Sequence, residues 1–223
     1  MKSRKLIKVA IDSPSAAGAG SLAKLISAHF NLVYLDTGKI YRFIGKIYLE
    51  NPKKFNYALV QKVSKNLNLK KLQDKKLLTD EIAVAASIIA KDKKIRQIVH
   101  GFQKKIAYFP PKKYAGSCLD GRDITSKIVK DAEFKFYVTA NVLERCKRRT
   151  TELKKLGKKI KFKDILKSIK KRDKSDMQRA ISPLIRTKDS WLINTTHLSI
   201  RGGFLKIKKI MDKKLKENYA RNI

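Results

Sequence analysis

Residue types that bind metals or form disulfides are scarce in this sequence of 223 residues. The two cysteines, Cys118 and Cys146, form no CxxC motif, and the three histidines, His29, His100 and His197, are scattered. A zinc site needs several such ligands at short spacings, and a disulfide framework needs several cysteines. The sequence therefore predicts neither, and we expect both thiols to be reduced and buried.

Long hydrophobic runs are also absent. No segment approaches the roughly 20 consecutive apolar residues that a membrane-spanning helix requires. Residues 1–8 lead directly into a strand-like segment, without the apolar region of a signal peptide. These features predict a cytoplasmic protein that has no membrane partner.

Acidic residues are few compared with basic ones. The chain has 54 Lys and Arg against 19 Asp and Glu, which gives a formal net charge of +35 at pH 7. This charge favours anionic partners, among them nucleic acids, anionic membranes and phosphorylated small molecules. An excess of lysines on solvated surfaces would give the same composition, so charge alone does not choose among these readings.

Short apolar segments alternate with segments of helical periodicity along the chain, which is long enough for one core. Strands separated by helices need crossover connections, and these favour a parallel sheet. The sequence thus predicts an α/β fold with a doubly wound, five-stranded parallel sheet and ligands at the carboxyl ends of its strands. We also predict one continuous helical segment over 82–106. The predicted strands cover residues 6–12, 32–35, 114–119, 134–138 and 191–193.

A loop of small residues follows the first predicted strand. Residues 13–21, SPSAAGAGS, precede a helix, so backbone N–H groups and the helix N-terminus can converge there on a phosphate. Compared with the phosphate-loop pattern GxxxxGK[ST], the loop keeps a hydroxyl at Ser21 but has Ala19 in place of the lysine. The predicted phosphate-binding residues are Ser13, Ser15, Ala16, Ala17, Gly18, Ala19, Gly20 and Ser21.

Further motifs follow the loop. They are DTGKIYR at 36–42, DGRD at 120–123, RDKSDMQRA at 172–180 and PL at 183–184. In order and spacing, the set resembles bacterial cytidylate kinases over nearly the whole chain. The resemblance implies the P-loop nucleoside monophosphate kinase fold and an enzyme that phosphorylates CMP, and also dCMP, with ATP and Mg²⁺. The single kinase domain, 1–223, would comprise a core (1–50, 107–144 and 180–223), a monophosphate-binding insert (about 51–106) and a lid (about 145–179).

The resemblance also implies which residues bind the monophosphate. Thr37, Arg42 and Arg122 would approach its phosphate, since a planar guanidinium can bind two phosphate oxygens at once. Arg172 and Asp176 would contact the ribose. A cytosine edge has an amino donor and two acceptors, which suits a carboxylate together with hydroxyl and guanidinium donors. The residues implied to bind cytosine are Ser87, Arg96, Asp123 and Arg179.

Phosphoryl transfer to an oxygen that is already anionic needs alignment and charge neutralisation rather than a general base. The resemblance implies that Ser21 holds Mg²⁺, with Asp120 as a further ligand, directly or through water. It also implies that Arg122 is catalytic and that one or more of the lid residues Arg145, Arg148 and Arg149 close on the transferred group.

Several positions depart from the cytidylate kinase pattern. They are Ala19 for the loop lysine, Ser13 and Ala16 for glycines, Ser175 for an arginine and Asn194 for an acid. Loss of the lysine should cost about 3–4 kcal/mol in the transition state, or roughly 100- to 1,000-fold in rate. We hypothesise that Lys39, which follows the second predicted strand, replaces this lysine as a catalytic residue.

Two alternatives stay open from the sequence. One is a catalytically impaired relative that binds nucleotides or RNA, which Ala19 and the positive charge favour. The other is an enzyme that acts on UMP, AMP or a shikimate-like alcohol, against which the Ser87, Arg96 and Asp123 set favours cytosine. The leading prediction is a monomeric CMP kinase that does not require nucleic acid.

Overall fold

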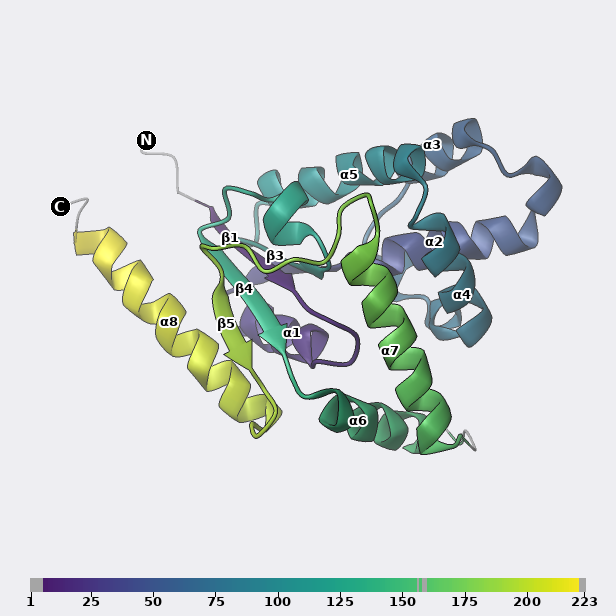
Figure 1. Cartoon of the computed structure of the whole chain (residues 1–223). Coiled ribbons are helices and arrows are strands. Elements are labelled where there is room, and N and C mark those ends of the chain that lie inside the picture. The colour runs from purple at the N-terminus through teal and green to yellow at the C-terminus, as the bar shows by residue number, and fades with distance from the viewer. Residues whose placement is uncertain (1–5, 156, 158–159, 221–223) are drawn as a thin grey trace.

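The computed structural model describes residues 6–155, 157 and 160–220 (Figure 1). The outer ends of the predicted core, 1–5 and 221–223, and residues 156, 158 and 159 of the predicted lid lie outside the described residues. Five parallel strands form one sheet in the order β2-β3-β1-β4-β5. The strands are β1 (Ile7–Asp12), β2 (Leu32–Asp36), β3 (Gly116–Gly121), β4 (Phe134–Thr139) and β5 (Trp191–Asn194).

The central strand β1 is apolar on both faces. Val9 and Ile11 pack in the core on one side of the sheet, and Ala10 packs in the core on the other. The register pairs Asp12 with Gly121 and Asp36 with Asp120, so the carboxyl ends of β1, β2 and β3 meet at one edge of the sheet. The predicted α/β class with a five-stranded parallel sheet is confirmed, although β3 begins and ends two residues later than predicted.

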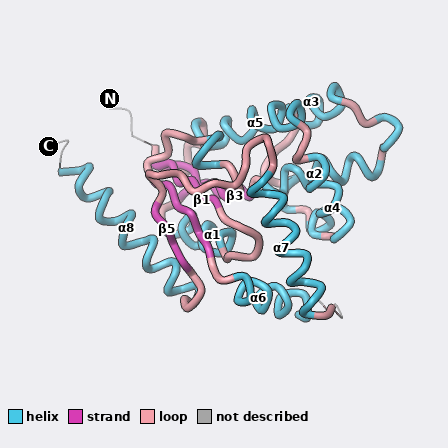
Figure 2. Tube along the Cα trace, in the orientation of Figure 1, coloured by secondary structure: helices cyan, strands magenta, loops and turns pink. Residues whose placement is uncertain are grey.

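Helices cover both faces of the sheet (Figure 2). α1 (Ala19–His29) and α8 (Ile200–Ala220) pack together on one face, where the large side chains of β4, Phe134 and Phe136, are fully buried. α2 (Gly38–Glu50), α3 (Tyr57–Lys65) and α5 (Lys93–Tyr108) contribute to the core on the other face. No helix in the described part of the chain is long and apolar enough to cross a membrane.

The prediction of one helical segment over 82–106 is wrong. Two helices occupy it, α4 (Asp80–Ile89), which packs against α2, and α5. The break falls at Asp92, whose carboxylate accepts the N–H of Ile95 at 2.9 Å and so caps the start of α5. Ser87 and Arg96 therefore belong to different helices.

The basic segment after β4 forms a helical pair, α6 (Val142–Lys155) and α7 (Phe162–Gln178). The pair has its own small core, made of Cys146, Leu153, Ile165 and Ile169. In Figure 1, α6 begins beyond the carboxyl end of β4 and α7 runs back beside the sheet. Both cysteines of the chain are buried and free, as expected.

Candidate functional site

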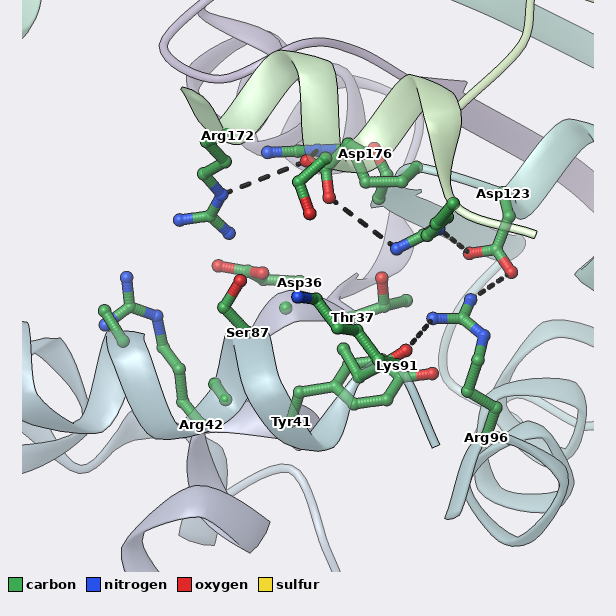
Figure 3. Close-up of a pocket in the computed structure, with 18 of the residues that line it drawn as sticks. Asp36, Thr37, Tyr41, Arg42, Ser87, Lys91, Arg96, Asp123, Arg172 and Asp176 are labelled. Atoms are coloured by element: carbon green, nitrogen blue, oxygen red, sulfur yellow. Dashed lines mark hydrogen bonds and ion pairs between the residues drawn. The ribbon is translucent and has the colours of Figure 1, made fainter. Parts of the chain in front are cut away.

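A cavity of about 240 Å³ lies at the carboxyl ends of β2 and β3, among α2, α4, α5 and α7 (Figure 3). The segments that form it are far apart in the sequence, and every residue predicted to bind the monophosphate lines it. These residues are Thr37, Arg42, Ser87, Arg96, Arg122, Asp123, Arg172, Asp176 and Arg179. The fold thus brings the whole predicted substrate set around one cavity.

One end of the cavity concentrates positive charge. Arg42 comes from α2, Arg122 follows β3 and Arg172 comes from α7. Burial, together with the neighbouring charge of Arg122, lowers the pKa of Arg172 to about 10, and burial also lowers the pKa of Arg42. Buried cations repel one another, and an anion bound between them relieves this repulsion. Guanidinium groups also bind phosphate oxygens well. This end suits a phosphate.

Asp176 of α7 lies among three arginines, Arg122, Arg172 and Arg179. Its Oδ2 is 2.8 Å from Nε of Arg122 and 3.9 Å from Nε of Arg172, and its Oδ1 is 3.7 Å from Nη1 of Arg179. The carboxylate therefore orients Arg122 by a hydrogen bond and attracts Arg172 and Arg179 by charge before any ligand arrives.

The other end of the cavity carries a buried ion pair. Nη2 of Arg96 donates to Oδ2 of Asp123, and both side chains are almost completely buried. The Arg96 guanidinium lies 5.4 Å from the centre of the Tyr41 ring, and Nη2 of Arg179 is 4.0 Å from Oδ1 of Asp123. Ser87 also points into the cavity from α4, but it lies on the side of Arg42 and Arg172 (Figure 3), so the hydroxyl nearest this ion pair is that of Tyr41. This end combines one carboxylate with hydroxyl and guanidinium donors.

Several buried polar atoms near this end have no hydrogen-bond partner in the described part of the chain. They include the Tyr41 hydroxyl, Nε of Arg96 and Nη2 of Arg179. Buried polar groups are normally paired, so such a concentration favours a site that a polar ligand or water completes.

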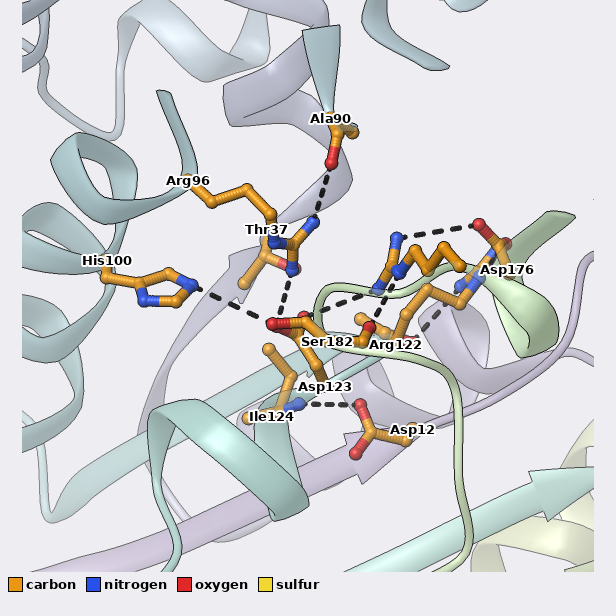
Figure 4. A network of polar contacts seen from close by, with 12 residues as sticks. Asp12, Thr37, Ala90, Arg96, His100, Arg122, Asp123, Ile124, Asp176 and Ser182 are labelled. Carbon is orange, nitrogen blue, oxygen red and sulfur yellow. Dashed lines mark hydrogen bonds and ion pairs between the residues drawn. The ribbon is translucent and has the colours of Figure 1, made fainter. Parts of the chain in front are cut away.

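Asp12, at the end of β1, fixes the backbone that follows Asp123 (Figure 4). It is fully buried and accepts the N–H groups of Ile124 and Thr125, each at 2.8 Å, and the Thr125 hydroxyl at 2.6 Å. Burial raises its pKa to about 6, against the lowering effect of these three hydrogen bonds. Asp12 is thus a structural acceptor that sets the turn carrying Asp123.

The predicted phosphate loop connects β1 to α1 and touches the cavity wall. The N–H of Ser13 donates to the carbonyl of Gly121 at 3.2 Å. Gly18 has φ 89° at the start of α1, and Ala16 has φ 59°, a left-handed conformation that is strained for alanine. A Cβ at Gly20 would lie 3.3 Å from Oδ2 of Asp120, so this carboxylate stands directly behind the loop.

Two buried residues of the helical pair clamp the loop at Ser15. Nη1 of Arg145 donates to the Ser15 carbonyl at 2.8 Å and to Oδ2 of Asp173 at 2.6 Å. The Ser15 N–H donates to Oδ1 of Asp173 at 3.0 Å. The predicted lid and the phosphate loop are therefore joined by a charged cluster.

The cations predicted to act in catalysis have different surroundings. Arg148 lies against the loop: its Nη1 is 3.9 Å from the position of a Cβ at Gly18, and it donates to the Thr195 hydroxyl at 3.0 Å. Arg149 pairs with Glu152 at 2.8 Å. Lys39 stands in the first turn of α2, half-buried, and is not among the residues that line the cavity. Its catalytic role stays a prediction.

The predicted magnesium ligands are oxygen donors. Asp120 accepts the Tyr34 hydroxyl at 3.1 Å, and burial together with the charge of Asp36 raises the pKa of Asp120 to about 8. Ser21 is exposed at the first turn of α1. No group of three His, Cys, Asp or Glu residues comes together as a metal site within the described ranges. A small donor set of this kind fits Mg²⁺, which keeps several waters and binds substrate phosphates.

Nine of the residues that line the cavity were not predicted as binding residues, among them the polar side chains of Asp36, Tyr41, Lys91 and Ser175. Tyr41 stands one helical turn after Thr37, so the spacing on α2 was a usable signal. Lys91 lies just beyond α4, where the incorrect continuous helix concealed its position.

Comparisons with known proteins agree on one family. The sequence profile of the family described as "Cytidylate kinase" matches residues 9–213. A cytidylate kinase of Bartonella bacilliformis is 37% identical over 215 residues, which cover 95% of this chain and 97% of that protein. One of Bartonella henselae is 39% identical over 202 residues, covering 88% and 90%. One of Rhodopseudomonas palustris is 37% identical over 196 residues, covering 87% and 91%.

Among solved structures, an uncharacterized protein from Eubacterium ventriosum has a similar fold. The TM-score is 0.55 at 16% sequence identity, over 93% of this chain and 99% of that one. At this identity the likeness concerns the fold alone.

Proposed function

The chain belongs to the cytidylate kinase family, and from this membership we propose that it transfers the γ-phosphoryl group of ATP to CMP. The observation that carries the proposal is the polarity of the cavity. Arginines surround one end, and a buried carboxylate with hydroxyl and guanidinium donors forms the other. A nucleoside monophosphate whose base has an amino group matches both ends.

Each end of the cavity then has a defined task. Thr37, Arg42 and Arg122 bind the CMP phosphate, while Arg172 and Asp176 face the ribose. Asp123 accepts the cytosine amino group, and Ser87, Arg96 and Arg179 supply the remaining polar contacts. Uracil presents a carbonyl oxygen where cytosine has the amino group, so it would meet the carboxylate of Asp123 unfavourably.

ATP binds at the loop 13–21, whose first residue contacts the cavity wall. An α-phosphate oxygen of CMP forms the new P–O bond while the bond between the γ-phosphorus and the bridging oxygen breaks, and ADP leaves. Because the attacking oxygen is already anionic, alignment and charge neutralisation carry the step. Arg122 serves on the acceptor side and Arg148 on the loop side, with Arg149 and Lys39 as further candidate cations.

Mg²⁺ bound with ATP would neutralise charge on the phosphates. Ser21 and Asp120 would hold it together with water and phosphate oxygens. The partition into a core, an insert over about 51–106 and a lid over about 145–179 remains a proposal, as do dCMP as a second acceptor, the monomeric state and a cytoplasmic location. None of the relatives favours a non-catalytic RNA-binding module.

A coupled assay of ADP release with Mg²⁺ and ATP tests the function. CMP should support turnover, and UMP and AMP should be at least tenfold poorer acceptors by kcat/KM. The variant Asp123→Asn should lose most of its preference for CMP over UMP, because an amide can turn its N–H₂ group toward the uracil carbonyl. Folded protein that binds CMP without turnover would contradict the proposal and support the binding module.

A further inference from the structure

His100 stands directly behind the carboxylate that we assign to the base. It lies on α5 one helical turn after Arg96, and both side chains face Asp123 (Figure 4). Nε2 of His100 is 3.9 Å from Oδ2 of Asp123. This nitrogen is enclosed and has no hydrogen-bond partner in the part of the chain that the structure describes. An enclosed imidazole nitrogen this close to a carboxylate needs only a small movement to donate a hydrogen bond to it.

The surroundings keep this imidazole neutral near pH 7. Burial lowers the pKa of His100 below its usual 6.5, and the charges of Arg96 and Lys104 on α5 act in the same direction. Asp123, which faces it across the gap, opposes the shift without reversing it. A neutral imidazole with its proton on Nε2 donates to Asp123 without placing a second buried cation beside Arg96.

We propose that His100 is a positioning residue that, together with Arg96, holds Asp123 in the orientation that selects cytosine. Both contacts engage Oδ2, which leaves Oδ1 for the substrate side, where Nη2 of Arg179 is 4.0 Å away. Once His100 moves within hydrogen-bond distance, two donors hold the same oxygen and the carboxylate cannot turn freely. The inference rests on the proposed function, because it concerns the residue that reads the base in that reaction.

Cytosine and uracil differ at the group that Oδ1 faces. Discrimination therefore depends on keeping an acceptor at this point, and it weakens when the carboxylate can rotate or draw back toward Arg96. His100 touches neither the transferred phosphoryl group nor the arginines at the other end of the cavity. Its loss should alter binding and selection of the base while the rate of the bound complex is preserved.

The experiment compares His100→Leu, His100→Gln and the control Gln97→Leu, an exposed residue on the same helix. His100→Leu should raise KM for CMP about tenfold, the size expected when one hydrogen bond to a charged group is lost. Its kcat should stay within about twofold, and the preference for CMP over UMP should fall about tenfold. His100→Gln, which keeps an N–H donor, should restore the KM for CMP and the preference for CMP over UMP to within about threefold of wild type. The control Gln97→Leu should match wild type.

Two results would overturn the inference. One is His100→Leu with an unchanged KM and an unchanged CMP preference. The other is a loss, in KM or in kcat, that is equal in His100→Gln and His100→Leu, which would indicate a purely structural role. Thermal unfolding and circular dichroism show that each variant is folded. A wild-type protein without CMP-dependent turnover would instead refute the proposed function, independently of His100.

Discussion

The clamp on the phosphate loop gives the sharpest energetic prediction. Asp173→Ala removes a carboxylate that accepts the Ser15 N–H at 3.0 Å and pairs with Nη1 of Arg145 at 2.6 Å. The side chains of Asp173 and Arg145 are only 12% and 7% exposed, so solvent screens the pair weakly. The substitution leaves the buried guanidinium of Arg145 without its counter-charge, and it leaves the N–H of Ser15 in the loop without its acceptor.

The expected cost is about 3 kcal/mol in the free energy of unfolding. Removing one partner of a buried pair costs about 3–5 kcal/mol, and Arg145 keeps its bonds to the carbonyls of Ser15 and Ala140, which places the effect at the lower end. For a chain of this size, each 1 kcal/mol lowers Tm by roughly 2–4 °C, so the decrease should be roughly 6–12 °C.

Urea unfolding of Asp173→Ala, Arg145→Met and the double variant measures the coupling between the two residues. The double variant should be destabilised by less than the sum of the single variants, by at least about 1.5 kcal/mol, because neither charge is left unpaired. Glu217→Ala removes the partner of Lys213, an exposed pair at 4.0 Å, and should change stability by less than about 0.5 kcal/mol.

A functional readout accompanies the stability series. Because the clamp holds Ser15 by both its N–H and its carbonyl, Asp173→Ala should also raise KM for ATP severalfold, while KM for CMP changes less. Additive single costs, or a loss below about 1 kcal/mol in Asp173→Ala, would refute the clamp as an energetic unit.

Two further predictions concern the loop charge and pH. If Lys39 replaces the missing lysine, Lys39→Ala lowers kcat roughly 100- to 1,000-fold, and adding Ala19→Lys recovers most of the loss. The control Lys24→Ala, on the exposed face of α1, should have no effect, and unchanged turnover in Lys39→Ala would refute the hypothesis. Ionisation of Asp12 opposes folding, because its pKa is about 6 in the folded state against an ordinary value of 3.8. The contribution of this group to the free energy of unfolding is therefore greatest below pH 3.8. It falls by about 3 kcal/mol as the pH rises through 6. In urea unfolding from pH 4 to 7, the difference between wild type and Asp12→Asn should follow this sign, and a difference independent of pH would contradict it.

Much of the fold follows from local pattern in the sequence. Apolar runs of three to seven residues, three of which end in Asp or are followed by it, predicted the strands, and their separation by helices predicted parallel pairing. The break between α4 and α5 was missed because apolar residues continue at helical spacing across it. Asp92 was nevertheless a readable capping signal, and so was Asn56, whose side chain accepts the N–H of Leu59 at the start of the unpredicted α3.

The residues around the cavity were predicted as a set from the resemblance of their motifs to cytidylate kinases. Only a few of them, such as Thr37 after β2 and Arg122 after β3, stand at the ends of parallel strands, and most of the others lie on helices. The supporting contacts were not predictable, because they join residues that no local pattern relates. Asp12 and Thr125 are 113 residues apart, and Ser15 and Asp173 are 158 apart. In the sequence, an aspartate at a strand end resembles a ligand, whereas burial and three donors make Asp12 a structural acceptor.

The phosphate loop shows how contacts outside a motif can preserve its shape when its sequence changes. Alanine at position 16 has φ 59°, where a left-handed conformation costs roughly 1–2 kcal/mol, yet the loop keeps a backbone that turns into α1. Ser13 is tied to Gly121 of β3, and Ser15 is tied to α6 and α7 by Arg145 and Asp173. These tertiary contacts therefore stabilise a left-handed backbone conformation that glycine would adopt without strain. Any movement of α6 and α7 that separates the clamp should also loosen the loop, so we expect ATP binding at the proposed site to be energetically coupled to the position of the helical pair.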